Sequence, residues 1–420
     1  MLVDGAGTIG QASPHNTPGE ELLYEHVHLN FAGNYHLAHA FAEQILGNAT
    51  NATPLLTEEE CAPRLAFTDF DRHRVLDEVR QRLTQPPFSS QLGHSEREGR
   101  LAVALKRLDR ASLTNAMEVY EQAIARAPED WILRENFATL LQDFGQTREA
   151  ETQWRKVIEL LPHSEQAYFA LGNLFEAEGR AAAAIEAYRE ALRRRPGSVE
   201  TRNGLGLALA DMGRFAEAIT EYKRALRQNP GFAEARVNLG QTLAQLGKFA
   251  EATAQYLEVL RQQSNNVPAR INLGKLLAVQ GKHSEAASQY REALRLAPDN
   301  AIAHYNLGNA LNALGDGDAA VAHFAEAVRH NPAFPEARYN LALGLAKQNR
   351  NEEVIEHLSE VVRLRPGFVE ARYNLGVALA KARRYQEASE ELREALRLQP
   401  ANTAAKKALE QVEARQRKEP

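Results

Sequence analysis

The stretch VEARYNLGVALAKARRYQEASEELREALRLQPAN, residues 369–402, decides the fold because its pattern recurs at a fixed distance along most of the chain. The segment directly before it, PEARYNLALGLAKQNRNEEVIEHLSEVVRLRPGF (335–368), shares the same EARYNL opening and the same proline near the end. Self-similarity at a fixed period is typical of repeat proteins. The chain is therefore expected to stack small structural units instead of building one globular core.

Prolines mark the ends of the units. They recur at one constant interval, with a single gap that a serine fills: Pro128, Pro162, Pro196, Pro230, Pro298, Pro332, Pro366 and Pro400, with Ser264 in the gap. Ten residues after each of the first eight positions comes a small residue: Ala138, Gly172, Gly206, Gly240, Gly274, Gly308, Ala342 and Gly376. A period of about 34 residues, on which both series agree, indicates a repeat architecture.

Each unit is predicted to be a hairpin of two helices. Apolar residues recur at helical spacing on both sides of a breaker, as in Ala150, Trp154 and Val157, which are spaced i, i+4 and i+7. The breaker is a glycine in the first six units, whereas Asn349 and Arg383 replace it in the last two. A left-handed residue that ends a helix is the usual reason for glycine there. The closing proline cannot continue a helix and separates one hairpin from the next.

Within each hairpin, the small residue on the first helix is expected to face an aromatic residue on the second. The small residue lets the two backbones approach closely, and the ring fills the space that remains between them. One hairpin buries too little surface to be stable alone, so stability should come from neighbouring units and from caps at the ends. Residues 403–418, with Ala405 and Val412 on one side, are predicted to form the C-terminal capping helix.

This pattern resembles the tetratricopeptide repeat (TPR) family over residues about 98–402. The resemblance implies an all-α superhelical solenoid of eight repeats from Trp131 to Asn402, with a degenerate ninth from about residue 98 and a capping helix and tail at 403–420. It further implies a right-handed superhelix whose concave wall, built by the first helices, holds extended peptides or partner helices. Fold alone does not supply a function, because these repeats serve many pathways.

Asparagine recurs at the sixth position of the predicted first helices, in six of the eight units: Asn136, Asn238, Asn272, Asn306, Asn340 and Asn374. Asparagine is a mediocre helix former, so its recurrence needs a reason beyond propensity. Its amide both donates and accepts hydrogen bonds, which suits the backbone of an extended peptide. The arrangement resembles the asparagine ladder of O-GlcNAc transferase repeats. The alternative is that these amides bond to neighbouring turns and hold the superhelix together.

Aromatic side chains precede three of these asparagines. Tyr305, Tyr339 and Tyr373 are candidate anchors for a bound peptide, because rigid aromatic residues are favoured contacts; the alternative is packing against the adjacent helix. Asn309 and Asn312 are expected to face the same groove.

Arginine recurs at the fourth position of six units: Arg134, Arg202, Arg236, Arg270, Arg338 and Arg372. These residues are interpreted as a solvated helix face with local ion pairs to glutamates two residues earlier, such as Glu200 and Glu370, with a cationic stripe for acidic partners as the alternative.

The first 50 residues lack the repeat and are predicted to be a short α/β-domain remnant. Residues about 12–45 resemble the C-terminal block of SGNH (GDSL-type) hydrolases, with Glu25 in place of the acid and His28 as the base. The resemblance implies that the acid orients the histidine, which deprotonates a serine. No serine block of that family precedes Glu25, so catalysis by this chain is not expected. The alternative function is therefore a fragment of an SGNH-type esterase or acyl hydrolase fused to the repeats, with its catalytic front missing.

Residues 51–97 are predicted to be a linker with one short helix. The nearby histidines at positions 26, 28 and 36 match no known ligand spacing, so neither a metal site nor a cofactor is predicted.

Composition narrows the choice of partners. The formal net charge is −5, with Lys+Arg 50 and Asp+Glu 55, which disfavours nucleic acid. No run approaches the roughly 18 apolar residues of a membrane span. The opening residues lack a signal peptide and Cys61 is the single cysteine, which favours the cytoplasm unless the N-terminus is truncated. The leading hypothesis is a scaffold that binds extended protein segments; the sequence does not define its oligomeric state.

Overall fold

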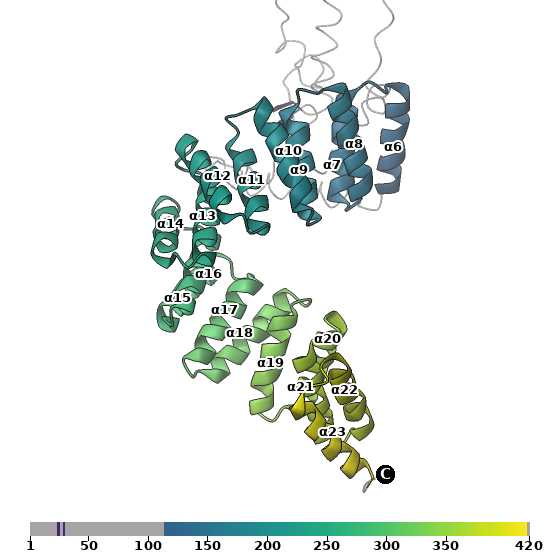
Figure 1. The fold of residues 1–420 in the computed structure, drawn as a ribbon, viewed down its shortest axis with the longest axis vertical. Coiled ribbons are helices and arrows are strands. Elements are labelled where there is room, and N and C mark those ends of the chain that lie inside the picture. Colours follow the sequence, from purple (N-terminus) through teal and green to yellow (C-terminus); the bar gives the residue numbers. More distant parts are fainter. Residues whose placement is uncertain (1–22, 26–27, 30–112, 418–420) are drawn as a thin grey trace, which may run out of the picture. The chain divides into compact units, whose positions relative to one another are not determined.

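The computed structural model describes residues 23–25, 28–29 and 113–417 of the 420-residue chain. From residue 113 onward, the described chain consists of helices joined by short turns (Figure 1). It forms two compact units, Met1–Arg195 and Pro196–Pro420. The prediction of an all-α repeat architecture is confirmed for the described residues from 113 to 417.

The first unit contains five described helices. They are α6 (Leu113–Arg126), α7 (Trp131–Asp143), α8 (Thr147–Leu160), α9 (Glu165–Ala177) and α10 (Ala181–Arg194). Helices α7 and α8 form one hairpin, α9 and α10 form the next, and α6 packs against α7. Tyr120 of α6 is buried and stacks on Phe137 of α7, with ring centroids 5.4 Å apart. Helix α6 thus has the burial pattern of a second helix, as its sequence predicted.

The second unit repeats the same hairpin. Its first helices are α11 (Val199–Asp211), α13 (Ala233–Gln245), α15 (Val267–Val279), α17 (Ala301–Ala313), α19 (Pro335–Lys347) and α21 (Val369–Lys381). Its second helices are α12 (Phe215–Gln228), α14 (Phe249–Gln262), α16 (His283–Leu296), α18 (Gly317–His330), α20 (Asn351–Leu364) and α22 (Tyr385–Leu398), followed by α23 (Thr403–Gln416). Each second helix packs against its own first helix and against the helix that follows it, which for α22 is α23.

The turn inside each hairpin uses a left-handed residue, as predicted. Six of these residues are glycines with φ between 70° and 86°: Gly145, Gly179, Gly213, Gly247, Gly281 and Gly315. Asn349 and Arg383 take the same conformation, with φ of 60° and 61°. A left-handed arginine is unusual, because only glycine, and to a lesser degree asparagine and aspartate, enters this region readily. The geometry of the hairpin therefore holds even where the preferred residue is missing.

The contact between small residue and ring is confirmed where the second helix carries a ring, whereas Gly376 of the last hairpin meets Leu392 instead. A Cβ atom added at Gly240 would lie 2.7 Å from Cε1 of Tyr256, and one added at Gly274 would lie 2.5 Å from Cε1 of Tyr290. Real Cβ atoms essentially never come so close to another heavy atom. Both tyrosines are at most 2% exposed. The glycines are thus required by close approach of the two helices and not by their backbone angles.

Helix α23 covers the end of the last hairpin, where Ala405 and Val412 are buried. Of the predicted N-terminal remnant, the structure describes only the strands β1 (Leu23–Glu25) and β2 (His28–Leu29), which pair antiparallel and set Glu25 opposite His28. The rest of segment 1–50, the linker at 51–97 and residues 98–112 lie outside the described residues. Among the described helices, none has both the length and the apolar character needed to traverse a lipid bilayer.

Candidate functional site

The first helices carry the predicted ladder asparagines, and all six of these side chains are half-buried. In the second unit, successive first helices touch one another, α11 with α13, α13 with α15 and α15 with α17. A residue at the sixth position therefore sits near the neighbouring first helix. This placement allows an amide to bond either to that helix or to a ligand.

Two ladder amides donate to an asparagine on the preceding first helix. Asn238 Nδ2 donates to Asn203 Oδ1 at 3.0 Å, and Asn203 in turn donates to Glu234. Asn340 Nδ2 donates to Asn309 Oδ1 at 2.9 Å. These bonds support the alternative interpretation, in which the ladder ties neighbouring hairpins together.

The other ladder asparagines do not share this type of hydrogen-bond partner. Asn374 Nδ2 donates to the hydroxyl of Tyr339 at 2.9 Å, so two predicted site residues bind each other. Asn306 Nδ2 is buried and has no hydrogen-bond partner among the described residues. A buried donor without a partner is uncommon in native proteins and calls for a water molecule or a ligand. Asn136 and Asn272 are half-buried like the others.

The three tyrosines predicted as anchors lie half-buried against the core. The Tyr305 ring lies 4.9 Å from the Phe334 ring, and the Tyr339 ring lies 4.8 Å from the Phe368 ring, centroid to centroid. Tyr373, like the other two, packs against the hydrophobic core of the second unit. Each ring is thus already in contact with its own protein, which favours the packing alternative, although part of each side chain stays accessible.

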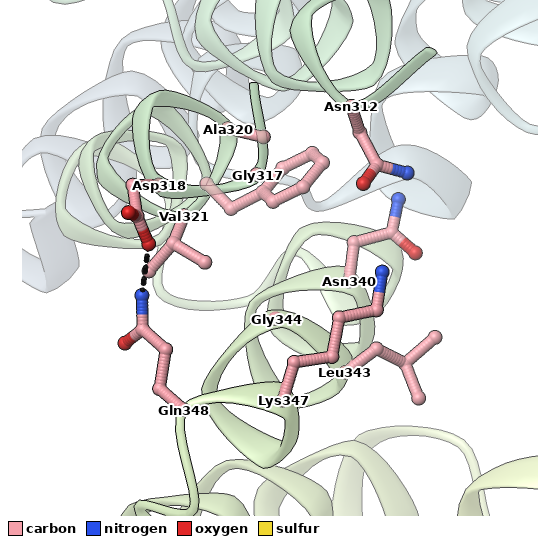
Figure 2. A pocket seen from close by; sticks show the side chains of 11 residues that line it. Asn312, Gly317, Asp318, Ala320, Val321, Asn340, Leu343, Gly344, Lys347 and Gln348 are labelled. Atoms are coloured by element: carbon pink, nitrogen blue, oxygen red, sulfur yellow. Dashed lines mark hydrogen bonds between the residues drawn. The ribbon is translucent and has the colours of Figure 1, made fainter. Parts of the chain in front are cut away.

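A pocket of about 470 Å³ opens between α17, α18 and α19 (Figure 2). It brings together Asn312 and Asn340, whose side chains point toward one another in Figure 2. Leu343 forms part of the wall with 37% of its surface exposed. Gly344 lets α19 approach α18, because a Cβ atom there would lie 2.3 Å from Cγ2 of Val321. Two predicted site residues therefore lie in one cavity with an exposed apolar side chain.

Some polar groups around this pocket already bond to one another, whereas others face solvent. Gln348 Nε2 donates to Asp318 Oδ1 at 2.8 Å, which closes one side of the pocket (Figure 2). Lys347 lies on the other side and is exposed. Its ammonium group donates only. The pocket thus offers an exposed cation next to two amides, a combination that suits carbonyl or carboxylate oxygens of a bound segment.

The fourth-position arginines have a role that the sequence analysis missed. We call them the arginine anchors: Arg134, Arg202, Arg236, Arg270, Arg338 and Arg372. Each donates to the backbone carbonyl six residues earlier, in the turn that enters the hairpin. Each also reaches the side chain 19 residues later on the second helix. Arg372, for example, donates to Pro366 O at 2.9 Å and to Glu391 Oε2 at 2.6 Å.

The prediction of a solvated face with ion pairs to the glutamate two residues earlier is therefore wrong. The guanidinium group instead joins the turn to the second helix, and its planar fork of donors can serve both acceptors at once. The sequence carries a signal for this arrangement. A glutamine, glutamate or histidine stands at the partner position of every anchor, but that spacing has meaning only once the hairpin geometry is known.

The anchor partner His357 yields a prediction about pH. Its Nδ1 lies 3.4 Å from Nη1 of Arg338, and burial lowers the pKa of the ring below its usual 6.5. Below about pH 6.5 the unfolded chain then binds protons more readily than the folded chain, so stability falls as the pH falls. Glutamine stands at this position in other repeats, for example Gln255. We expect the His357→Gln variant to lose less stability than the wild type between pH 7 and pH 5.

Urea denaturation at both pH values would measure this difference. The His163→Gln variant is the control, because His163 is exposed in a turn. A His357→Gln variant with the same pH dependence as the wild type would contradict the assignment.

Comparison with protein families matches the tetratricopeptide repeat at residues 135–199, 203–267, 271–337, 313–367 and 339–403. These matches cover more than half of the chain. The chain belongs to the tetratricopeptide repeat family. A TPR fold of this kind is typical of protein-interaction scaffolds, since its stacked repeats form extended binding surfaces. No curated protein sequence matches the chain.

Solved TPR structures resemble the chain in part. The TPR protein YrrB, described as having an unusual peptide-binding site, is 27% identical, covers 44% of this chain and 96% of its own, and has a TM-score of 0.39. The type IV pilus biogenesis factor PilW is 22% identical, with coverages of 50% and 96% and a TM-score of 0.45. A tetratricopeptide repeat protein from Parabacteroides merdae is 16% identical, with coverages of 62% and 98% and a TM-score of 0.48. None of the comparisons supports the resemblance of residues 12–45 to SGNH hydrolases.

Proposed function

We propose that this TPR protein is a scaffold that binds an extended segment of a partner protein along its first helices, with the pocket between α17, α18 and α19 as a central contact. The pocket of about 470 Å³ carries this proposal, because it places an exposed leucine, two asparagine amides and a lysine around one cavity. We also infer eight repeats with a partial ninth that contributes α6.

The chemistry of the pocket suggests what the bound segment contains. Leu343 and the neighbouring Val321 offer apolar surface, and burial of one aliphatic side chain contributes about 1.5–3 kcal/mol. Asn312 is exposed at the rim, so its amide is available to a peptide backbone. Lys347 favours a carboxylate close to the apolar residue. We therefore expect a segment with an aliphatic residue next to an acidic one.

Energetics require more than one contact. A neutral hydrogen bond contributes about 0.5–1.5 kcal/mol net, whereas ordering a flexible segment costs roughly 2–5 kcal/mol. The amides alone would thus bind weakly. Asn340 and Asn374 are partly committed to contacts between repeats, which shifts the expected binding energy toward Leu343 and Lys347.

A peptide library displayed on phage provides a probe that needs no known partner. Sequences enriched on the wild type would be synthesised and their affinities measured by fluorescence anisotropy. The double variant Leu343→Asp, Lys347→Glu should bind these peptides at least about tenfold more weakly, which corresponds to roughly 1.4 kcal/mol. Both side chains are exposed, so the helical circular dichroism should be unchanged.

The matched control makes the same chemical changes outside the pocket, at Leu257, which is 53% exposed on α14, and at exposed Lys223 on α12. This Leu257→Asp, Lys223→Glu variant should bind like the wild type. Equal affinity of the pocket variant and the wild type would refute the proposed site, and failure to enrich any peptide would count against the scaffold function.

A further inference from the structure

Three histidines gather in the hairpin of α17 and α18, at positions where other repeats carry different residues. His304 stands where six repeats have an arginine anchor. His323 stands where the anchor partner lies, and His330 occupies a position held by leucine in several other repeats, for example Leu296 and Leu364. The three residues lie on two different helices, so only the hairpin brings them together.

Their side chains form one cluster with Glu326. One ring nitrogen of His304, one of His330 and one carboxylate oxygen of Glu326 all lie within 4.8 Å of one another. Nε2 of His330 is 3.6 Å from Oε2 of Glu326. The His304 and His330 rings stack, with centroids 5.7 Å apart and an angle of 11° between their planes. His323 completes the cluster, with its Nδ1 3.0 Å from Nδ1 of His304.

These distances are close to those of a metal site. Zinc binds histidine nitrogen and carboxylate oxygen at about 2.0–2.2 Å, so ligand atoms in a tetrahedral site stand roughly 3.3–3.6 Å apart. The pair formed by His330 and Glu326 already has this separation. The ligand nitrogen of His304 lies within 4.8 Å of both of these atoms, so it would have to move closer when a metal ion binds.

The hydrogen bonds leave lone pairs on the two ligand histidines. Nε2 of His304 lies 3.0 Å from the carbonyl oxygen of Pro298, which only accepts, so this nitrogen carries the proton. A metal-binding histidine commonly donates its other N–H in this way, which fixes its ring. Nη2 of Arg329 lies 2.7 Å from Nε2 of His330 and can only donate, so Nε2 of His330 accepts. The lone pair of His330 thus meets Arg329 and that of His304 meets His323, so each becomes available to a metal ion once its neighbour moves away.

We propose that His304, Glu326 and His330 bind one divalent first-row transition-metal ion, with Zn²⁺ as the best fit and His323 as the adjacent fourth nitrogen. Imidazole and carboxylate ligands suit zinc and its neighbours better than calcium or magnesium, which take mainly oxygen ligands. The ion would link α17 to α18 within one hairpin. It would stabilise that hairpin, which also forms one wall of the pocket described above.

Arg329 is the competing cation in this site. Its guanidinium group donates to both Glu326 Oε2, at 2.6 Å, and His330 Nε2. Its side chain is 64% exposed, so it can swing into solvent when a metal ion takes its place. Removal of this arginine should therefore strengthen metal binding.

A purely structural role does not explain the cluster. The anchor function needs only the contacts of His304 with Pro298 and His323, which reproduce the bonds of an arginine anchor. His330 makes neither of these two bonds and only stacks on the His304 ring. In the repeat beginning at residue 165, an arginine at the equivalent position, Arg194, bonds the turn carbonyl itself, whereas His330 faces the cluster.

Isothermal titration of the full chain with Zn²⁺, after treatment with a chelator, tests the proposal. The double variant His304→Arg, His323→Gln rebuilds the arginine anchor and partner seen at Arg236 and Gln255, and His330→Leu restores the residue of other repeats. Both variants should fold as well as the wild type. Each is expected to lose one equivalent of Zn²⁺ or to bind it at least tenfold more weakly.

The chain has 13 histidines, and others among them can also bind Zn²⁺, so the difference between variants assigns the site. The control is His283→Gln, which changes a histidine outside the cluster. This control should bind like the wild type. Wild-type stoichiometry and affinity in either cluster variant would overturn the proposal.

Two further readouts separate this site from weaker surface binding. Co²⁺ bound to the wild type should give the visible absorption of a tetrahedral ion, and the His330→Leu variant should lack it. Arg329→Ala should bind Zn²⁺ more tightly than the wild type by about threefold or more. Unchanged or weaker binding by Arg329→Ala, or the same absorption in His330→Leu, would count against the proposed ligands.

Discussion

Replacement of Tyr256 by alanine should lower the free energy of unfolding by about 3–5 kcal/mol, the range found when buried aromatic residues are truncated. The ring is 2% exposed and fills the space between α13 and α14 left by Gly240. The glycine has no side chain with which to refill that space. Because repeat proteins are stable mainly through contacts between neighbours, the loss should spread to the hairpins on either side. Urea denaturation and amide hydrogen exchange of α13 and α14 would measure both effects.

A paired substitution tests the cause of this loss. Gly240→Ala alone should be destabilising, because its Cβ atom would meet Cε1 of Tyr256 at 2.7 Å. Adding Tyr256→Leu recreates the combination of Ala342 and Leu358 that another hairpin already uses. The two changes together should be less destabilising than the sum of the single changes, by about 0.5–3 kcal/mol. Additive effects would show that the ring and the glycine are not packed against each other.

The sequence predicted the hairpins so fully because local rules and the repeat agree. The left-handed turn residue, the proline at the end and the pairing of Gly240 with Tyr256 are each visible within one period of the repeat. Even Arg383 was predictable as a left-handed turn residue, because it occupies the place of the turn glycine in the repeat. An arginine side chain alone would not have indicated this conformation. The period thus reveals which positions are equivalent, and equivalent positions have the same backbone conformation.

The period does not reveal what a polar side chain binds. Asn340 and Asn306 occupy equivalent positions, yet the first bonds to Asn309 while the Nδ2 atom of the second is buried without a described partner. The difference arises because the hydrogen-bond partner comes from the neighbouring repeat, and the residue at that place varies from one repeat to the next. Asn374 likewise depends on the hydroxyl of Tyr339. Predicting such contacts requires the packing of two hairpins, which no single period contains.

The same limit explains why the histidine cluster and the arginine anchors escaped the sequence analysis. Rules for charged pairs in helices consider residues three or four apart. His304 and His330 lie on different helices, and an anchor meets its partner 19 residues later, across the turn of a hairpin. Comparison of equivalent positions would have exposed His304, like Tyr168, as a departure from an arginine series. Departures from a repeat are therefore as informative as the repeat.

The second large effect is expected at an arginine anchor. Arg372→Met keeps the apolar stem but removes the guanidinium group, which leaves the Pro366 carbonyl and the Glu391 carboxylate without their donor. Loss of a partner for such groups typically costs about 1–3 kcal/mol. Both side chains of the ion pair are shielded, with 12% and 25% of their surfaces exposed, so solvent replaces the lost bonds poorly. We expect the variant to unfold at a clearly lower urea concentration than the wild type.

The burial of the ion pair, and not the distance between its charged atoms, should decide how much stability is lost. Arg397 pairs with Glu394 at 2.7 Å, close to the 2.6 Å between Arg372 and Glu391, but its side chain is 68% exposed. Exposed pairs of this kind contribute little, so Arg397→Met should change stability by less than about 0.5 kcal/mol. Glu391→Gln should also be mild, because Gln255 serves as the partner of Arg236 in another repeat. Equal losses for Arg372→Met and Arg397→Met would mean that the contact with the turn carbonyl, which only Arg372 makes of the two, adds nothing to the stability of the hairpin.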